Sequence, residues 1–451
     1  MIDLVRSSSV SAGISPARRA AFEILLRVEE GAYASVLLAT REQELTPLDR
    51  ALCHELVMGV LRWQLWLDRL IEYYANRKVA ELDVAVRLIL RLGLYQLRFL
   101  SRVPASAAVN ESVNLANFAR LRSASGLVNA VLRRATREPD HDPAKTIDDP
   151  IEKTAVATSH PAWLIERWTK AFGIEEAEAF ARSNNEPAAV AFRVVKNRAR
   201  PSEIIEQLQR SGASLIPSRI ARGAWKISGG TSLLSKLVAE GQVYLQDEAS
   251  QLVAGVLQAE PGHRVLDLCA APGSKTTQIA DTTSDSAIIV ASDLHEHRLR
   301  TVVQTAQSQG LASIHCVALD GLQPLPVGRN AFDRVLVDAP CSGTGTLRRN
   351  PEIRWRISPA DIEELSQRQK QLLFNAAGTV KPGGRLVYST CSVEISENED
   401  LRQAFLESNL SFRSVELPLD TSLLTSTGAA RTWPHRDGTD GFFFCAFERK
   451  S

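Results

Sequence analysis

Apolar residues recur at helical spacing through the first third of the chain. Within residues 17–30 the apolar positions fall on one face of a helix. Thr46 followed by Pro47 is typical of an N-cap and a first helical residue, and we expect that helix to continue through Leu61. The same spacing predicts further helices over residues 84–100, 109–119 and 126–136. We therefore predict an all-helical domain over residues 1–145.

The pattern becomes mixed in the next hundred residues. Prolines and aspartates crowd residues 138–149, a composition that predicts a linker. Residues 150–183 again favour helices. Short strands are predicted over residues 189–195 and 224–227, with a helix over 202–211 between them. We expect residues 146–240 to form a helical linker and a small α+β module.

Strands and helices alternate in the last part of the chain. Continuous apolar runs predict strands over residues 265–268, 287–292, 314–318, 335–337 and 385–389. Helices are predicted over residues 275–280 and 297–309. Such runs, bounded by turns, are typical of a parallel sheet covered on both faces. We expect residues 241–451 to form a doubly wound, Rossmann-like α/β domain that binds its ligand at the carboxyl ends of the strands. The protein is thus expected to be multidomain.

Charge and cysteine usage restrict the possible partners and the compartment of the protein. Residues 1–137 hold 19 Lys and Arg against 13 Asp and Glu, although the whole chain carries a net charge of only +1. A basic helical domain is compatible with a nucleic-acid partner, and equally with solvated helix faces. The six cysteines are scattered without metal-type spacing, so we expect reduced thiols, no metal site and a cytoplasmic protein. No apolar stretch is long enough to span a membrane or to resemble a signal peptide.

A small-residue loop follows the first strand of the α/β domain. Asp267-Leu268-Cys269-Ala270-Ala271-Pro272-Gly273-Ser274-Lys275-Thr276 passes from a strand into a helix. Small residues allow a ligand to approach the backbone, and a helix N-terminus offers free N–H groups. The glycine spacing is not that of a Walker A loop. We interpret the segment as a ligand-binding turn, although an ordinary tight turn would have a similar composition.

Aspartates stand at the ends of three successive strands. Asp293, Asp320 and Asp338 each follow an apolar run. A carboxylate at such a position can accept hydrogen bonds from ribose hydroxyls, whereas a single one is often only a helix cap. Three of them after a small-residue loop favour a cofactor that contains a nucleoside.

Two cysteines are predicted at the same edge of the sheet. Cys341 lies in Asp338-Ala339-Pro340-Cys341-Ser342-Gly343, and Cys391 in Ser389-Thr390-Cys391-Ser392. A single free cysteine is usually a small buried apolar residue. Two thiols beside a cofactor pocket instead suggest covalent chemistry. For Cys269, inside the cofactor loop, packing is the favoured interpretation.

Arginines follow the second of these motifs. The segment Arg348-Arg349-Asn350-Pro351-Glu352-Ile353-Arg354-Trp355-Arg356 combines four cations with an indole ring. We expect Arg348, Arg349, Arg354, Trp355 and Arg356 to bind a nucleic acid through phosphate contacts and base stacking, the alternative being a solvated basic turn.

The motifs together resemble a known family. Asp-Leu-Cys-Ala-Ala-Pro-Gly-x-Lys-Thr, Asp-Ala-Pro-Cys-Ser-Gly-x-Gly and Ser-Thr-Cys-Ser occur in this order, as in RNA cytosine-5 methyltransferases. Gln246-Asp247-Glu248-Ala249-Ser250 and Asp440-Gly441-Phe442-Phe443 are similar to that family too. The helical domain resembles NusB. The combination resembles the bacterial 16S rRNA (cytosine-5) methyltransferase B family, also called Sun or Fmu, over nearly the whole chain. One departure is Ser274, where the family usually has glycine; serine fits if its φ is negative.

The resemblance implies a class I fold, S-adenosylmethionine as cofactor, and a role for each motif. Residues Cys269 to Lys275 would wrap the amino-acid part of the cofactor, Asp293 would bind its ribose, and Asp320 would lie beside its adenine. Arg298 and Asp338 are further candidates for the cofactor site. Cys391 would attack carbon 6 of cytosine, Asp338 would hold or protonate N3, and Cys341 would help to release the enzyme.

The resemblance also implies the substrate, which would be an unpaired cytosine of 16S rRNA, cytosine 967 in the RNA's own numbering, with no DNA or membrane partner. The chemistry requires these groups: a thiolate at C6 makes C5 nucleophilic, and an acid at N3 stabilises the developing charge. The base must leave any stack to reach the pocket, which favours unpaired RNA.

Two alternatives remain. A DNA cytosine-5 methyltransferase would use the cysteine of the Pro-Cys motif as nucleophile, and Cys391 argues against it. An RNA-binding assembly or transcription factor with a degenerate methyltransferase fold would not need the intact Asp338, Cys341 and Cys391.

Overall fold

The computed structural model of the protein describes residues 13–41 and 44–451. The chain forms two compact units. Unit 1 holds the residues through Asn185 together with Arg349–Arg356, and unit 2 holds Glu186–Arg348 and Ile357–Ser451. Among the described residues, no helix combines the length and the apolar character needed to cross a membrane.

Unit 1 is built of helices, as the sequence predicts. They are α1 (Pro16–Glu29), α2 (Ala34–Arg41), α3 (Pro47–Arg62), α4 (Gln64–Ala75), α5 (Val84–Phe99), α6 (Ala105–Phe118), α7 (Ser125–Arg137), α8 (Pro150–Thr158), α9 (Ala162–Phe172), α10 (Ile174–Ser183) and α16 (Ile353–Arg356). Thr46 is the N-cap of α3 and its side chain accepts a hydrogen bond from the amide of Asp49, which confirms that boundary. The apolar faces of α1, α3, α5 and α7 share one core. Helices α2 and α4 were not predicted.

The first part of unit 2 is the expected α+β module. Its elements are β1 (Val190–Val194), α11 (Pro201–Arg210), β2 (Ser214–Pro217), β3 (Ala224–Ser228), α12 (Thr231–Ala239) and β4 (Val243–Leu245). The four strands form an antiparallel sheet in the order β2-β3-β1-β4. Its apolar residues pack with Ile204 and Leu208 of α11 and Leu237 of α12 in a small core of their own.

The rest of unit 2 is a Rossmann-like domain. Its elements are α13 (Glu248–Val256), β5 (Arg264–Asp267), α14 (Ser274–Thr282), β6 (Ile288–Asp293), α15 (Glu296–Gln309), β7 (Ile314–Ala318), β8 (Phe332–Asp338), α17 (Pro359–Ala377), β9 (Val380–Thr390), α18 (Glu399–Ser408), β10 (Phe412–Val415), β11 (Ala430–Arg431), α19 (Pro434–Asp437) and β12 (Phe443–Arg449). The strand order is β10-β12-β9-β8-β5-β6-β7, and β11 pairs with β12.

The sheet is mixed rather than wholly parallel. Strands β9, β8, β5, β6 and β7 run parallel, as predicted, whereas β12 is antiparallel to both β9 and β10. The chain moves from β5 to β6 and β7 on one side, and to β8 and β9 on the other. The carboxyl end of β5 is therefore the topological switch point, where open α/β sheets bind ligands.

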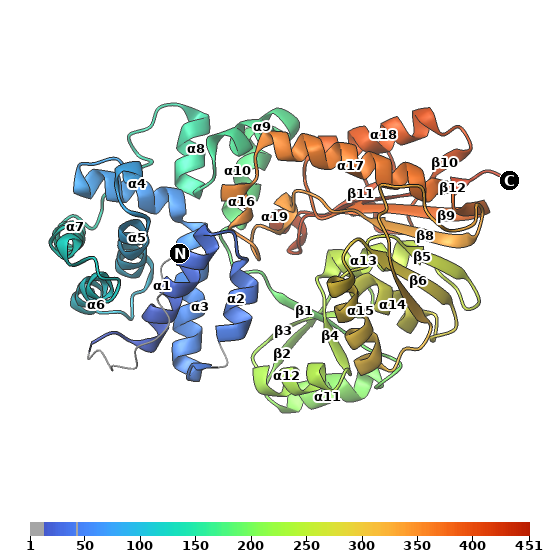
Figure 1. The fold of residues 1–451 in the computed structure, drawn as a ribbon, viewed down its shortest axis with the longest axis horizontal. Helices are drawn as coiled ribbons and strands as arrows, with labels where there is room; N and C mark the ends of the chain where they lie inside the picture. Colours follow the sequence, from blue (N-terminus) through green and yellow to red (C-terminus); the bar gives the residue numbers. More distant parts are fainter. Residues whose placement is uncertain (1–12, 42–43) are drawn as a thin grey trace. The chain divides into compact units, whose positions relative to one another are not determined.

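Alternation along the strands produces two cores. Val265, Leu336 and Val387 face a core shared with α13 and α14. Their neighbours Leu266, Val335 and Leu386 face a second core shared with α17 and α18. Figure 1 shows α14 and α15 on one side of the sheet and α17 and α18 on the other. Because both faces are covered, the carboxyl edge of the parallel strands is left for function.

Candidate active site

The small-residue loop joins β5 to α14 at the switch point. Gly273 has a φ of +104°, a conformation that favours glycine, and an added Cβ would lie 3.2 Å from Val302. Ser274 is the first residue of α14 and has no positive φ, so the structure meets the condition under which serine fits there. Cys269 is partly buried, and burial raises the pKa of its thiol well above the usual range, which favours the neutral thiol.

Three carboxylates lie at or just beyond the ends of β6, β7 and β8, as predicted. Asp293 ends β6, is 4% exposed, and pairs with Arg298 at 3.2 Å. Arg298 also donates to the carbonyl oxygen of Ala271 at 3.3 Å, so it links Asp293 to the loop. Asp320 follows β7 and accepts a hydrogen bond from the amide of Leu322 at 2.9 Å. Asp338 ends β8.

Asp267, at the end of β5, is a buried acid. The hydroxyl of Thr276 donates to one of its oxygens at 2.6 Å. Its other oxygen, Oδ1, is buried without a hydrogen-bond partner among the described residues. Burial is the main cause that raises the pKa of Asp267 to about 7, and the hydrogen bond from Thr276 opposes that rise.

Lys275 reaches from α14 to Asp338. Its Nζ lies 2.6 Å from Oδ2 of Asp338, and the hydroxyl of Ser389 donates to Oδ1 of Asp338 at 2.6 Å. Burial lowers the pKa of Lys275, but the charge and hydrogen bond of Asp338 outweigh burial and leave the pKa above its ordinary value. The ring of Phe442 lies 5.3 Å from the ammonium. Asp338 is therefore held beside a cation, with 27% of its side chain exposed.

The two candidate reactive cysteines meet. The sulfur atoms of Cys341 and Cys391 are 3.3 Å apart. The amide of Gly345 donates to the carbonyl oxygen of Cys391 at 2.9 Å and thus ties the two loops together. The pKa of Cys341 is raised well above its ordinary value, first by its hydrogen bond with Cys391 and then by burial. Both causes favour the neutral thiol of Cys341 over its thiolate.

Glu397, a buried glutamate that contacts the residues next to both cysteines, was not predicted from the sequence. Glu397 ends the short 3₁₀ turn Ile395–Glu397 and is fully buried. Its carboxylate accepts hydrogen bonds from Ser342 and Ser392, the residues that follow the two cysteines. The only signal in the sequence is its place six residues after Cys391, in a run of polar residues typical of a solvated helix start.

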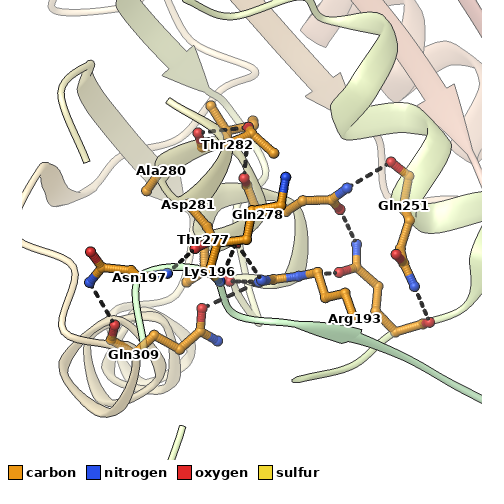
Figure 2. Close-up of polar contacts among 12 residues, drawn as sticks. Arg193, Lys196, Asn197, Gln251, Thr277, Gln278, Ala280, Asp281, Thr282 and Gln309 are labelled. Atoms are coloured by element: carbon orange, nitrogen blue, oxygen red, sulfur yellow. Dashed lines mark hydrogen bonds and ion pairs between the residues drawn. The ribbon is translucent and has the colours of Figure 1, made fainter. Parts of the chain in front are cut away.

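Arg193 on β1 connects the small module to α14 (Figure 2). Its Nη2 donates to the Thr277 hydroxyl at 2.9 Å, and that hydroxyl donates to the carbonyl oxygen of Gly273 at 2.8 Å. Its Nε donates to Gln246 at 3.0 Å, which gives the Gln-Asp-Glu-Ala-Ser motif a structural role. Burial lowers the pKa of Arg193 to about 10, opposed by the charge of Asp281. Through these hydrogen bonds the small α+β module helps to fix the loop that contains Gly273.

Much of the Arg-rich segment is bonded within the protein itself. Arg354 is 0% exposed, and its Nη1 donates to the carbonyl oxygen of Ser159 at 3.2 Å and to Oδ1 of Asn185 at 2.9 Å within unit 1. Burial lowers the pKa of Arg354 to about 9. The terminal nitrogens of this guanidinium are bonded within the protein, and its buried Nε has no hydrogen-bond partner among the described residues, so the group is not exposed to a phosphate.

The neighbours of Arg354 are engaged as well. The Trp355 indole donates to the carbonyl oxygen of Leu61 at 2.8 Å, and Arg356 donates to carbonyl oxygens in the turn after α1. In unit 2, Arg348 is 6% exposed and lies 3.4 Å from Asp440. Arg349 is half-buried. These placements give no support to the predicted stacking of a base on Trp355 or to phosphate contacts by Arg348 and Arg354, because the protein itself occupies these groups.

The sheet and the side chains at its carboxyl edge define the class of protein. A Rossmann-like sheet with a small-residue turn after its central strand and acidic side chains at successive strand ends is the architecture of a methyltransferase domain. The crystal structure of PH0851 is similar over 97% of this chain and 99% of its own, with 29% identity and a TM-score of 0.84. The structure of NSun6 from Pyrococcus horikoshii with SFG shares the fold over 64% of this chain at 20% identity, with a TM-score of 0.59.

The chain belongs to the RsmB/F family of methyltransferases. The family model described as 16S rRNA methyltransferase RsmB/F matches residues 254–448. The NusB family matches residues 15–137, and the ferredoxin-like domain of RsmF/B-like methyltransferases matches residues 160–233. Relatives include the probable ribosomal RNA small subunit methyltransferase B of Bacillus subtilis, 35% identical over 96% of this chain and 98% of its own. The corresponding protein of Synechocystis is 37% identical over 96% of this chain and 99% of its own.

Proposed function

We propose that the protein transfers a methyl group from S-adenosylmethionine to C5 of a cytosine in 16S ribosomal RNA. The observation that carries the proposal is the 3.3 Å separation of the Cys341 and Cys391 sulfurs at the edge of the sheet that also holds Asp338. The names of the relatives, ribosomal RNA small subunit methyltransferase B, support the RNA substrate. By the resemblance noted above, the target is the cytosine given there, and the reaction takes place in the cytoplasm.

The residues at the switch point suit S-adenosylmethionine. When bound, this cofactor supplies an electrophilic methyl group. The turn from Cys269 to Lys275 lets a ligand approach the backbone, and Asp293 and Asp320 offer carboxylates to a nucleoside. The buried Oδ1 of Asp267, which has no hydrogen-bond partner among residues 13–41 and 44–451, offers an acceptor to a cationic amino group. We assign the amino-acid part of the cofactor to the loop side and its ribose to Asp293.

Cys391 acts as nucleophile. Its thiolate adds to C6 of cytosine, the C5–C6 double bond opens, and N3 takes up a proton. C5, now enamine-like, would bond to the methyl group as the bond between that methyl and the donor's sulfonium sulfur breaks, which leaves the donor as a neutral thioether. Loss of the C5 proton, then of the N3 proton and the Cys391 thiolate, restores the aromatic ring.

Asp338 serves the ring nitrogen. Held by Lys275 at 2.6 Å and by the Ser389 hydroxyl, its side chain is fixed near the cysteines and still partly exposed. As a carboxylate it would relay to N3 the proton that Cys391 gives up on forming its thiolate, and return that proton at release, so charge does not accumulate in the ring.

Cys341 accepts the C5 proton. The hydrogen bond with Cys391 is the largest cause that keeps the pKa of Cys341 high. For this step Cys341 would first release its own proton to solvent, so that its thiolate can take the proton from C5.

The direct test is methyl transfer. The purified protein is incubated with S-adenosylmethionine carrying a labelled methyl group and with 16S rRNA transcript, small ribosomal subunits or DNA of the same sequence, and the product is mapped by bisulfite sequencing. We expect label at one cytosine of the RNA. Cys391→Ala should lose transfer while keeping cofactor binding, and Cys316→Ala, a half-exposed thiol on β7, should behave like the wild type. Transfer to DNA alone, or normal turnover by Cys391→Ala, would contradict the proposal.

A further inference from the structure

Glu397 is the common acceptor for the two cysteine loops. Its Oε1 accepts hydrogen bonds from the amide of Ser342 at 2.9 Å and from the side-chain amide of Gln369 at 2.7 Å. Its Oε2 accepts from the hydroxyl of Ser342 at 2.5 Å and from the hydroxyl of Ser392. Each carboxylate oxygen therefore has two donors, and the side chain is fully buried.

The donors come from both loops of the proposed active site. Ser342 follows Cys341 in the loop after β8, and Ser392 follows Cys391 in the loop after β9. The two serine hydroxyls lie 2.9 Å apart and share one oxygen of Glu397. The carboxylate thus holds two residues that are 50 positions apart in the chain, each next to a thiol.

The chemistry of a carboxylate explains why this residue is glutamate. An ionised carboxylate only accepts, and it can satisfy four donors at once. Hydrogen bonds to an ionised acceptor are roughly twice as strong as those between neutral groups. A glutamine of the same shape would present N–H groups to donors on one side and so break half of the arrangement. In addition, Gln369 carries the network to the carbonyl oxygen of Pro340, just before Cys341, at 2.9 Å.

We propose that Glu397 is a positioning residue that sets the distance between the two thiols by holding Ser342 and Ser392. The proposal rests on the function proposed above, because it is in that reaction that both sulfurs must reach adjacent carbons of one ring. Fixed geometry of this kind matters for rate, since a displacement of about 1 Å can cost about a hundredfold. Glu397 itself is buried and takes no part in bond formation.

The first experiment reads the geometry without any methyl transfer. The intact protein is treated with diamide, which accepts two electrons and two protons as two thiols join in a disulfide, and the Cys341–Cys391 peptide is quantified by mass spectrometry. With sulfurs 3.3 Å apart, the wild type should form this bond rapidly. Glu397→Gln should slow it by about tenfold or more. Glu399→Gln, which loses a nearby carboxylate that pairs with Arg431 rather than the cysteine loops, should match the wild type. Equal rates for all three proteins would overturn the proposal.

The second experiment separates positioning from general stability. Glu397→Gln should lower kcat about a hundredfold, while KM for RNA and the Kd for S-adenosylmethionine stay within about threefold of wild type. If Glu397→Gln does not fold, Ser342→Ala and Ser392→Ala replace it, since each removes one hydroxyl and leaves the buried carboxylate partly satisfied. Each should slow disulfide formation, and the double variant should be little worse than either one. Wild-type rates of disulfide formation in both serine variants would reject the assignment, and a protein that lacks methyl transfer but still shows these differences would count against the proposed function alone.

Discussion

The ammonium of Lys275 and the carboxylate of Asp338 lie 2.6 Å apart, across the edge between the cofactor loop and the cysteine loop. This contact joins the first residues of α14 to the end of β8. The contact with Lys275 holds the negatively charged carboxylate of Asp338 in place, and the hydroxyl of Ser389 binds the other oxygen of that carboxylate. One ion pair therefore connects the part of the site assigned to the methyl donor with the part assigned to the base.

Lys275→Met should lower methyl transfer more than tenfold, because Asp338 loses the partner that orients it. The structure offers a matched control: Lys381 on β9 pairs at 2.7 Å with Asp333, which lies at the other end of β8 from Asp338. Lys381→Met removes an equivalent contact and should leave turnover unchanged. Steady-state kinetics on both variants checks this, and equal losses would show that the Lys275 contact has only a structural role.

Cys341→Ala should trap a covalent complex between the protein and its RNA. The variant retains Cys391 and can form the bond to C6, but it lacks the group that accepts the C5 proton. The complex should appear as a slow band on a denaturing gel and should be absent from Cys341→Ala/Cys391→Ala. A band that persists in the double variant would place the bond on another residue.

Gly345→Ala should destabilise unit 2 and disturb the site. An added Cβ would lie 1.9 Å from the carbonyl oxygen of Gly441 and 2.8 Å from that of Cys391, and neither backbone atom can yield easily. Gly255, in α13, has open space where a Cβ would stand, so Gly255→Ala should instead stabilise the protein by up to about 1 kcal/mol. Urea unfolding of both variants measures the difference. Equal free energies of unfolding would contradict it.

Asp267→Asn should change how stability depends on pH. Burial raises the pKa of Asp267 from its ordinary value of 3.8 to about 7, so the folded state binds the extra proton between these values. Stability contributed by the protonated acid is complete below about pH 4 and is lost as pH rises towards 7. Asparagine removes this loss. As pH rises from about 4 to 7, the free energy of unfolding of Asp267→Asn should therefore gain on that of the wild type by about 1.4 kcal/mol per pH unit. Parallel stability curves for the two proteins would reject the assignment.

Local sequence signals predicted most of what positions the site. Thr46 with Pro47 located a helix start, and the run from Asp267 to Lys275 located the turn between β5 and α14, because both signals depend on neighbouring residues only. The parallel strands were predicted since their apolar runs are continuous. The two thiols were expected at one edge of the sheet, and they lie within 3.3 Å of each other.

Features that depend on distant contacts were missed. The aromatic run of β12 was noted only as a motif, because nothing nearby in the chain reveals that it inserts antiparallel beside β9. Glu397 stands in a polar run that would suit a solvated helix start, yet the fold buries it beneath both cysteine loops. Arg354 appeared suited to phosphate for the same local reason, and the carbonyl oxygens that satisfy it come from residues nearly two hundred positions earlier.

The path of the chain around Arg349–Arg356 has a practical consequence for anyone who wishes to dissect this protein. These eight residues belong to unit 1, although they lie in sequence between Cys341 and Cys391 of unit 2. A fragment that begins at Glu186 would therefore keep Arg354 and Trp355 but lose the carbonyl groups of Leu61 and Ser159 that receive their hydrogen bonds. Separate expression of the two parts would leave the Arg354 guanidinium and the Trp355 indole without these partners, in the segment that links Cys341 to Cys391. A loss of activity on truncation could therefore come from this disturbed segment as well as from the missing domain.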